Sequence, residues 1–181
     1  MKILNKPQIQ EADRQTIRME PIESIYLMER AAKACFKWIY QHYNMDQKFT
    51  LLCGTGNNGG DGLALYRMLR QKKYTCTLFE FKLGKIPSHD YNLNKSKIAK
   101  ENFKELTPES LSGIQKNEVI IDALLGTGLN RPVEGSLKRI IQVLNGMPNT
   151  ILSIDIPTGL FSDFNHENPP YGIVQATHTL C

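Results

Sequence analysis

The 181-residue chain is predicted to be an α/β protein with a mainly parallel sheet and helices at its N-terminus. Short apolar runs that suit buried strands alternate with segments of helical periodicity, which is the pattern of βαβ units. Glycine-rich segments follow two of these runs, as is common where a strand turns into a helix. The region before the first run carries helical periodicity alone.

The N-terminal region is predicted to hold two helices. Residues 9–17 suit a short one, and Pro21 precedes a longer one from about Glu23 to Tyr43. Apolar residues spaced by three and four mark a buried stripe on the longer helix, namely Ile25, Met28, Ala32, Cys35 and Ile39. The stripe is widened by Leu27, Ala31, Ala34 and Trp38. A helix this broadly apolar lies deep in the core or joins a second subunit, so a homodimer stays open.

The rest of the chain is predicted to alternate strands with helices. Strands are expected at 49–53, 75–81, 119–122 and 150–155, and a fifth begins at about 176–180. Helices are expected at about 62–71, 92–102 and 137–144. Asn, Asp and Pro make 161–171 a loop. Right-handed crossovers then place helices on both faces of the sheet.

Composition favours a soluble cytoplasmic protein with a small-molecule ligand. Hydrophobic residues make up 41% and charged residues 22%, and the net charge of +4 is scattered along the chain. A nucleic-acid binder usually gathers its basic residues on one face. No apolar run is long enough to span a membrane. The four cysteines form no C-x-x-C pair and no zinc spacing, which favours a reducing compartment.

Three predicted strands end in segments that combine glycine with polar or acidic residues. These segments are residues 53–62, 122–131 and 155–160. The carboxyl ends of parallel strands meet at one edge of a sheet, where ligands of open α/β proteins bind. The three segments are therefore expected to converge on one site.

The first segment formally matches G-x-G-x-x-G from Gly54 to Gly59, between a predicted strand and a predicted helix. Glycine lets the backbone approach a phosphate, and the helix end that follows attracts an anion. The alternative is a purely structural strand-to-helix turn. Two roles are open for Asp61 as well, because it could cap the following helix or contact a ligand.

Asp122 and Asp155 each end an apolar strand. A partly buried carboxylate there needs a partner or a bound cation, although Asp is also common as a cap on the next element. Oxygen atoms from Asn58, Asp122 and Thr158 would suit a hard cation. No Cys or His lies in the three segments to suit a softer metal.

The three segments resemble the motifs of a known family. Residues 57–62 read Asn-Asn-Gly-Gly-Asp-Gly, residues 122–129 read Asp-Ala-Leu-Leu-Gly-Thr-Gly-Leu, and residues 155–160 read Asp-Ile-Pro-Thr-Gly-Leu. In this order they resemble the YjeF N-terminal family, the NAD(P)H-hydrate epimerases. Residues 11–13 and 27–31 also look like the N-terminal helices of that family. The resemblance covers nearly the whole chain.

The resemblance implies a Rossmann-like three-layer α/β/α fold and an isomerase. The substrate would be NADHX or NADPHX, the hydrated forms of the reduced nicotinamide cofactors, whose R and S epimers the enzyme would interconvert. A dehydratase, fused or separate, would then repair the S form. One potassium ion per subunit would be held by Asn58, Asp122 and Thr158. Thr158 stands where the family usually has Ser, and its extra methyl group would tighten that site.

The resemblance also implies the contacts with the substrate, which are Asn57, Asn58, Gly59, Gly60, Asp61, Gly126, Thr127, Gly128, Leu129, Asn130, Arg131, Pro132 and Asp155. We expect Asp155 to be the catalytic residue, as an acid or base or as the stabiliser of a cationic ring. Family domains continue past residues 176–180. Residues 1–181 are therefore expected to be a single domain that is truncated at its C-terminal end.

Two alternatives remain open. An NAD(P)-dependent oxidoreductase would place an acid at the end of the second strand to bind ribose, and Glu80 stands there. The chain has little room for a separate substrate domain, however. A non-catalytic scaffold with the same fold tends to lose the acidic and Asn positions, whereas Asn58, Asp61, Asp122 and Asp155 are all present here.

Overall fold

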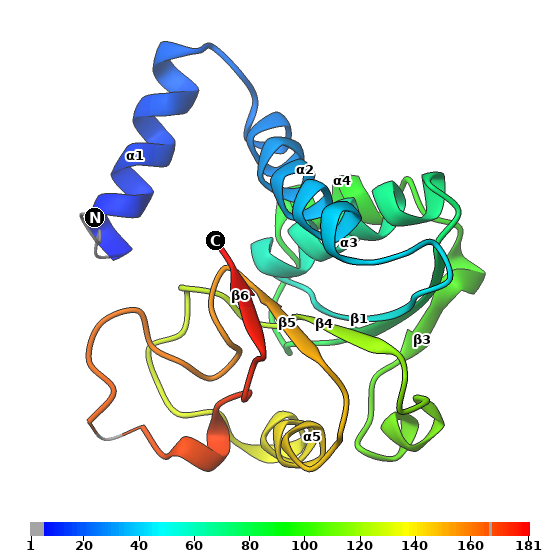
Figure 1. Cartoon of the computed structure of the whole chain (residues 1–181). Helices are drawn as coiled ribbons and strands as arrows, with labels where there is room; N and C mark the ends of the chain where they lie inside the picture. The colour runs from blue at the N-terminus through cyan, green and yellow to red at the C-terminus, as the bar shows by residue number, and fades with distance from the viewer. Residues whose placement is uncertain (1–5, 167) are drawn as a thin grey trace.

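The computed structural model describes residues 6–166 and 168–181, and its strands form one parallel sheet in the order β3-β2-β1-β4-β5-β6 (Figure 1). The strands are β1 (Lys48–Gly54), β2 (Thr75–Phe81), β3 (Phe103–Glu105), β4 (Val119–Ala123), β5 (Ile151–Ile154) and β6 (His178–Leu180). Every pairing between neighbours is parallel. The strand order reverses at β1, so the crevice between β1 and β4 is the expected ligand position.

Helices cover both faces of this sheet, which confirms the predicted three-layer α/β/α class. The helices are α1 (Lys6–Met19), α2 (Ser24–His42), α3 (Asn57–Gln71), α4 (His89–Lys95) and α5 (Gly135–Asn145). α2, α3 and α4 lie on one face and α5 on the other (Figure 1). Short 3-10 turns occupy residues 100–102, 109–113 and 170–172. Within the part of the chain that the structure describes, no helix is long and apolar enough to cross a membrane.

Each face of the sheet has its own apolar core. Neighbouring residues of the central strand β1 point to opposite faces, so Leu51 joins the core beneath α3 and Leu52 joins the core above α5. Both side chains are fully buried. A central parallel strand is covered on both sides, which is why β1 reads as a continuous apolar run.

The structure revises the bounds of two predicted helices. α3 begins at Asn57 rather than at about residue 62, so residues 57–62 of the glycine-rich segment belong to the helix and not to a loop before it. The helix expected over 92–102 was wrong in extent, because α4 spans His89–Lys95. Ser88 starts it by accepting a hydrogen bond from the Tyr91 N–H at 3.3 Å. The short strand β3 that follows was not predicted, whereas the fifth predicted strand is found as β6.

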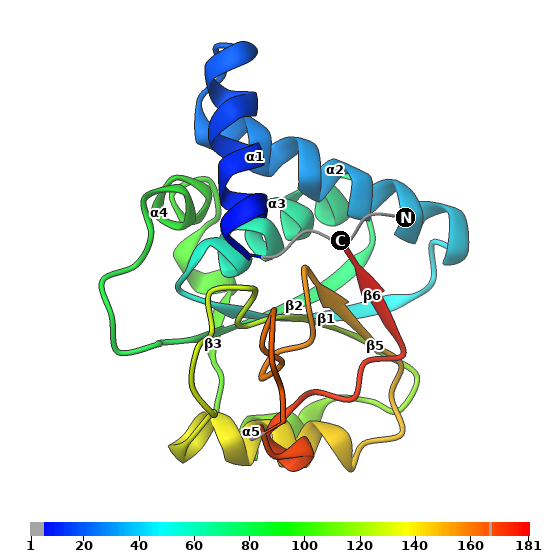
Figure 2. The ribbon, with the colours of Figure 1, turned by 90° about the vertical axis from the view of Figure 1, so that its left-hand side faces the viewer.

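The helix α1 stands away from the body, on the side where the strands end (Figures 1 and 2). The predicted stripe of α2 is buried inside this chain, except that Cys35 is only partly buried. The residues that widen the stripe, such as Leu27 and Trp38, line the cleft that is described next. α1 and the outer face of α2 thus form one side of the cleft described next.

Candidate active site

A cleft of about 1590 Å³ opens at the carboxyl ends of β1, β4 and β5. One side is formed by α1 and α2, with Ile9, Ile17 and Leu27. The other side is formed by residues 81–85 and 124–137. Pockets for drug-sized ligands are roughly 300–1,000 Å³, so this cleft has room for a dinucleotide.

The three glycine-containing segments meet in this cleft. Among the predicted site residues, it is lined by Asn57, Asn58, Asp61, Gly126, Thr127, Gly128, Leu129, Asn130, Arg131, Pro132 and Asp155. Gly59, Gly60, Asp122 and Thr158 are not part of the lining, and lie buried behind it. The parallel sheet therefore brings the segments to one edge, while the roles of the single residues stay predictions.

The Asp155 carboxylate is held at the wall of the cleft. Its Oδ2 accepts a hydrogen bond from the Thr127 N–H at 2.7 Å. A Cβ added at Gly126 would lie 2.2 Å from the same oxygen and 3.3 Å from the Asn58 Cβ, so only glycine leaves room for this arrangement. Asp155 has φ of 67°, in the left-handed region that costs free energy for a non-glycine residue. Such strain is concentrated at functional sites.

Asp122 lies fully buried behind Asp155, at the end of β4. Its carboxylate accepts hydrogen bonds from the Thr158 hydroxyl at 2.6 Å, the Thr158 N–H at 2.9 Å and the Ser153 hydroxyl at 2.8 Å. Burial raises the pKa of Asp122, and these hydrogen bonds oppose that rise. The structure thus brings together two of the three predicted cation ligands, and Ser153 is a partner that the sequence analysis missed.

Asn58 has a buried side-chain amide with no protein partner. Its residue exposure is 8%, and neither Oδ1 nor Nδ2 finds a hydrogen-bond partner among the residues that the structure describes. Buried amides almost always have partners, so an unpaired one at a cleft points to a ligand or ion. With Asp122 and Thr158 it offers carboxylate, hydroxyl and amide oxygens, which fit a hard cation. Over residues 6–166 and 168–181, no group of three His, Cys, Asp or Glu side chains suits a metal.

Glu80 does not line the cleft, although it lies one residue before the end of β2, near where an oxidoreductase would place its ribose-binding acid. Its carboxylate accepts hydrogen bonds from the Tyr91 hydroxyl and the Lys95 ammonium group. Burial opposes ionisation of Glu80, but the bonds from Lys95 and Tyr91 outweigh it, and the pKa of Glu80 is lowered. The Glu80 carboxylate therefore binds side chains of α4 rather than facing the cleft, which argues against the oxidoreductase alternative.

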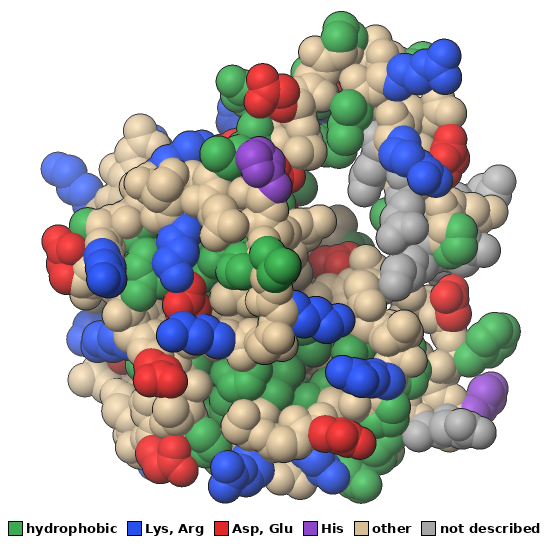
Figure 3. All heavy atoms as spheres, turned by 180° about the vertical axis from the view of Figure 1, so that it is seen from behind, with side chains coloured by type: hydrophobic (Ala, Val, Ile, Leu, Met, Phe, Trp, Pro, Cys, Tyr) green, Lys and Arg blue, Asp and Glu red, His purple; other side chains and the backbone are tan. Residues whose placement is uncertain are grey.

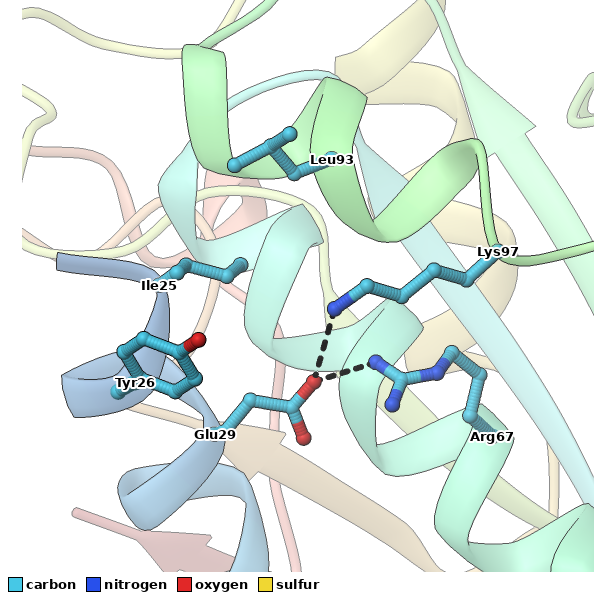
Figure 4. Close-up of a pocket in the computed structure, with 6 residues that line it drawn as sticks. All are labelled: Ile25, Tyr26, Glu29, Arg67, Leu93 and Lys97. Atoms are coloured by element: carbon cyan, nitrogen blue, oxygen red, sulfur yellow. Dashed lines mark hydrogen bonds and ion pairs between the residues drawn. The ribbon is translucent and has the colours of Figure 1, made fainter. Parts of the chain in front are cut away.

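A smaller pocket of about 480 Å³ lies on the far side of α2, between α2, α3 and α4 (Figure 4). At its centre, Glu29 Oε1 is 2.5 Å from Arg67 Nη1 and 3.5 Å from Lys97 Nζ. Arg67 also donates to Asn94 Oδ1 at 2.5 Å. The Nδ2 of Asn94 in turn donates to the Gly60 carbonyl at 3.4 Å. This network ties the three helices together behind the glycine-rich turn, and the sequence analysis did not find it.

The surface opposite to the view of Figure 1 carries mixed charges. Lys and Arg side chains are interspersed with Asp and Glu over this face and do not form one broad basic area (Figure 3). The upper right part of the same view is α1, set apart from the body by a gap. This face therefore offers no single-sign patch that would direct a large charged partner to it.

The fold and the cleft define a Rossmann-like α/β protein with its ligand site at the carboxyl edge of the sheet. Residues 24–181 match the family described as YjeF-related protein N-terminus, and the chain belongs to that family. The crystal structure of yeast ynu0 (YNL200c) is similar, with a TM-score of 0.82 and 20% identity. The alignment covers 99% of this chain and 79% of the yeast chain, which shows a shared fold.

Relatives of known name divide into two kinds. A protein of Anaerococcus prevotii named NAD(P)H-hydrate epimerase is 34% identical, over 90% of this chain and 77% of its own length. A protein of Dictyoglomus turgidum named bifunctional NAD(P)H-hydrate repair enzyme Nnr is 32% identical, over 90% of this chain. The chain spans only 32% of the length of that second relative. The family thus includes short proteins and longer two-function proteins.

Proposed function

We propose that this chain is an NAD(P)H-hydrate epimerase domain, which interconverts the R and S forms of NADHX and NADPHX. The names of its relatives support the reaction. The observation that carries the proposal is the Asp155 carboxylate, which Thr127 holds at the wall of a cleft lined by all three motif segments. A scaffold protein has no need for a strained acidic residue in a dinucleotide-sized cleft.

The reaction inverts the ring carbon that carries the added hydroxyl group. Its C–O bond breaks and re-forms on the other side of the ring, or the ring opens and closes. Either route moves a proton and passes through a charged intermediate. We assign Asp155 to this chemistry, as the group that gives and takes the proton or as the negative charge that stabilises a cationic ring. Its bond to the Thr127 N–H fixes the direction of the carboxylate.

We also propose that Asn58, Asp122 and Thr158 hold one potassium ion per subunit. The ion would supply positive charge that offsets the two carboxylates and fixes the three segments relative to one another. The unpaired Asn58 amide and the buried Asp122 carboxylate support this assignment. Ser153 and Thr158 keep the Asp122 carboxylate in place, since both donate to it.

The substrate would lie along the segment from Asn57 to Asp61 and the segment from Gly126 to Pro132. The first turn of α3 begins at Asn57, and the N-terminal end of this helix would attract a phosphate. A dehydratase, separate or fused, would consume the S epimer. We infer a homodimer from the broadly apolar sequence of α2, and a cytoplasmic location from the four free cysteines.

The first test follows the recovery of NADH from a mixture of R and S NADHX, with a dehydratase that consumes only the S form. The wild type is compared with Asp155→Asn, because Asn tolerates the left-handed backbone that Asp155 adopts. Asp163→Asn, which neutralises an exposed carboxylate elsewhere, is the control. We expect Asp155→Asn to be slower by about 100-fold or more, as loss of a general acid or base gives.

Two outcomes would contradict the proposal. Conversion of the R form at the spontaneous rate by the folded wild type would favour the scaffold alternative. Net hydride transfer to or from the nicotinamide cofactor would favour an oxidoreductase.

The potassium assignment has a test that does not depend on activity. A bound ion raises the melting temperature, because it stabilises only the folded state. We expect potassium to raise the Tm of the wild type more than choline at equal ionic strength, and Asn58→Ala to lose this difference. An equal Tm for the wild type in both salts would exclude the site.

A further inference from the structure

The loop after β2 is fastened to the glycine-rich turn. The Leu83 N–H donates to the Thr55 hydroxyl at 3.3 Å, and the Ser88 N–H donates to the Thr55 carbonyl at 3.0 Å. Thr55 lies between the two glycines that precede α3. Residues 81–85 are thereby held beside the start of α3, and they line the cleft. In dinucleotide-binding α/β proteins, this position faces the ribose of the adenosine.

Glu80 is the acid expected to bind the ribose 2′-hydroxyl in such proteins, but it does not line the cleft. Glu80 lies one residue before the end of β2, but its carboxylate accepts hydrogen bonds from Tyr91 and Lys95 of α4 and does not line the cleft. A carboxylate facing the ribose would also repel a 2′-phosphate. Its withdrawal removes that repulsion, so the position no longer disfavours the phosphorylated cofactor.

Two lysine side chains, rather than a carboxylate, line the cleft just after β2. Lys82 and Lys85 line the cleft, and both side chains are exposed. Neither lysine forms an ion pair with an acid in the described part of the chain. Lys82 follows directly after Phe81, the last residue of β2, and it helps to lower the pKa of Glu80 at longer range. Two lysines that form no ion pair within the described residues are suited to bind a phosphate dianion.

We infer that Lys82 and Lys85 bind the 2′-phosphate of the substrate, so that this chain prefers NADPHX to NADHX. The inference rests on the proposed function for the identity of the reaction. The phosphate site after β2 can be tested separately from that reaction. The same lysines would also attract the pyrophosphate that both substrates share. The test therefore separates the two phosphate positions.

The probes are two stable fragments, ADP-ribose and 2′-phospho-ADP-ribose, whose binding is measured by calorimetry. We expect the wild type to bind the 2′-phosphorylated fragment about 10-fold more tightly, which corresponds to one charge-assisted hydrogen bond. The double variant Lys82→Gln/Lys85→Gln is expected to lose this preference. The control Lys33→Gln/Lys116→Gln removes the same charge from exposed residues that do not line the cleft, and it should keep the preference.

Two outcomes would overturn the inference. Equal affinity of the wild type for both fragments shows that no site for the 2′-phosphate exists. Equal weakening of both fragments in the double variant assigns the lysines to the pyrophosphate. The R-NADHX assay is run on the same samples, so loss of the phosphate preference is distinguished from absence of epimerase activity.

Discussion

The two glycine-rich segments of the cleft use the same residue for different reasons. In the first, a Cβ at Gly54 would lie 2.1 Å from the Leu124 carbonyl oxygen, and a Cβ at Gly59 would lie 1.7 Å from the Gly54 carbonyl oxygen. In the second, a Cβ at Gly128 would meet no atom within 4 Å. The first segment is packed tightly against protein backbone at Gly54 and Gly59, whereas the second is open at Gly128.

This difference indicates that two glycines of the G-x-G-x-x-G match, Gly54 and Gly59, are required for packing. Gly54 and Gly59 allow β1, the start of α3 and the end of β4 to approach each other closely, which is the structural alternative that the sequence left open. Asn57, Asn58 and Asp61 of the same segment still line the cleft. The glycines of the first segment therefore build the site, and its polar residues face the ligand.

The largest effect expected from this comparison is on stability. Gly59→Ala places a methyl group on the Gly54 carbonyl, which cannot move without shifting β1. We expect a loss of about 3 kcal/mol or more in the free energy of unfolding, because the overlap is with backbone in a packed core. Urea unfolding measures it. Gly113→Ala is the control, since its Cβ would meet nothing within 4 Å. A loss below about 1 kcal/mol would show that the first segment is not tightly packed at Gly59.

The start of α3 shows what sequence could not predict about the fold. Glycine is a poor helix former, so propensity placed the helix after the motif, at about residue 62. Packing against β1 outweighs that propensity, and the helix begins at Asn57. The strands β1, β2 and β4 were predicted well because their burial depends on their own apolar runs. The bond from Asn94 to the Gly60 carbonyl depends on how α4 packs on α3, and no local pattern reports it.

The same limit applies to the candidate site. Its three segments were predictable, because parallel strands end at one edge and each segment has a local motif. Asp122 and Thr158 are hydrogen-bonded to each other, and their role as cation ligands stays a prediction. The partners of Glu80 were not predictable, since Tyr91 and Lys95 come from a helix whose bounds were wrong. Glu80 was therefore assigned to a ribose in one alternative, whereas the structure assigns it to α4.

A second, smaller effect on the free energy of unfolding is expected at Glu80, near the end of β2. It tests whether this strand end, like the first segment, serves the packing of the protein. The pKa of Glu80 lies below its ordinary value of 4.5. A lowered pKa means that ionised Glu80 contributes stability above that value, and that the contribution is lost as the pH falls through the lowered pKa. We expect Glu80→Gln to lose about 1 kcal/mol of unfolding free energy at neutral pH, because Lys95 is partly exposed and the pair is screened.

The measurement is urea unfolding of the wild type and Glu80→Gln across the acid range. The difference between the two should shrink as the pH falls below 4.5. Glu105→Gln, which removes the charge of an exposed acid on β3, is the control for the loss of one carboxylate. A difference that does not change with pH would mean that ionised Glu80 is not what stabilises α4.

The smallest effect on stability is expected at the open segment. Gly128→Ala adds a methyl group where no protein atom lies within 4 Å, so the free energy of unfolding should change by less than about 0.5 kcal/mol. The same methyl group would stand in the cleft that Gly128 lines, and we expect it to raise KM for the hydrated cofactor with little change in melting temperature. Steady-state kinetics and a thermal melt on one sample give both values. An unchanged KM would mean that the second segment is open without touching the substrate, and the glycine at Gly128 would then need an explanation other than ligand binding.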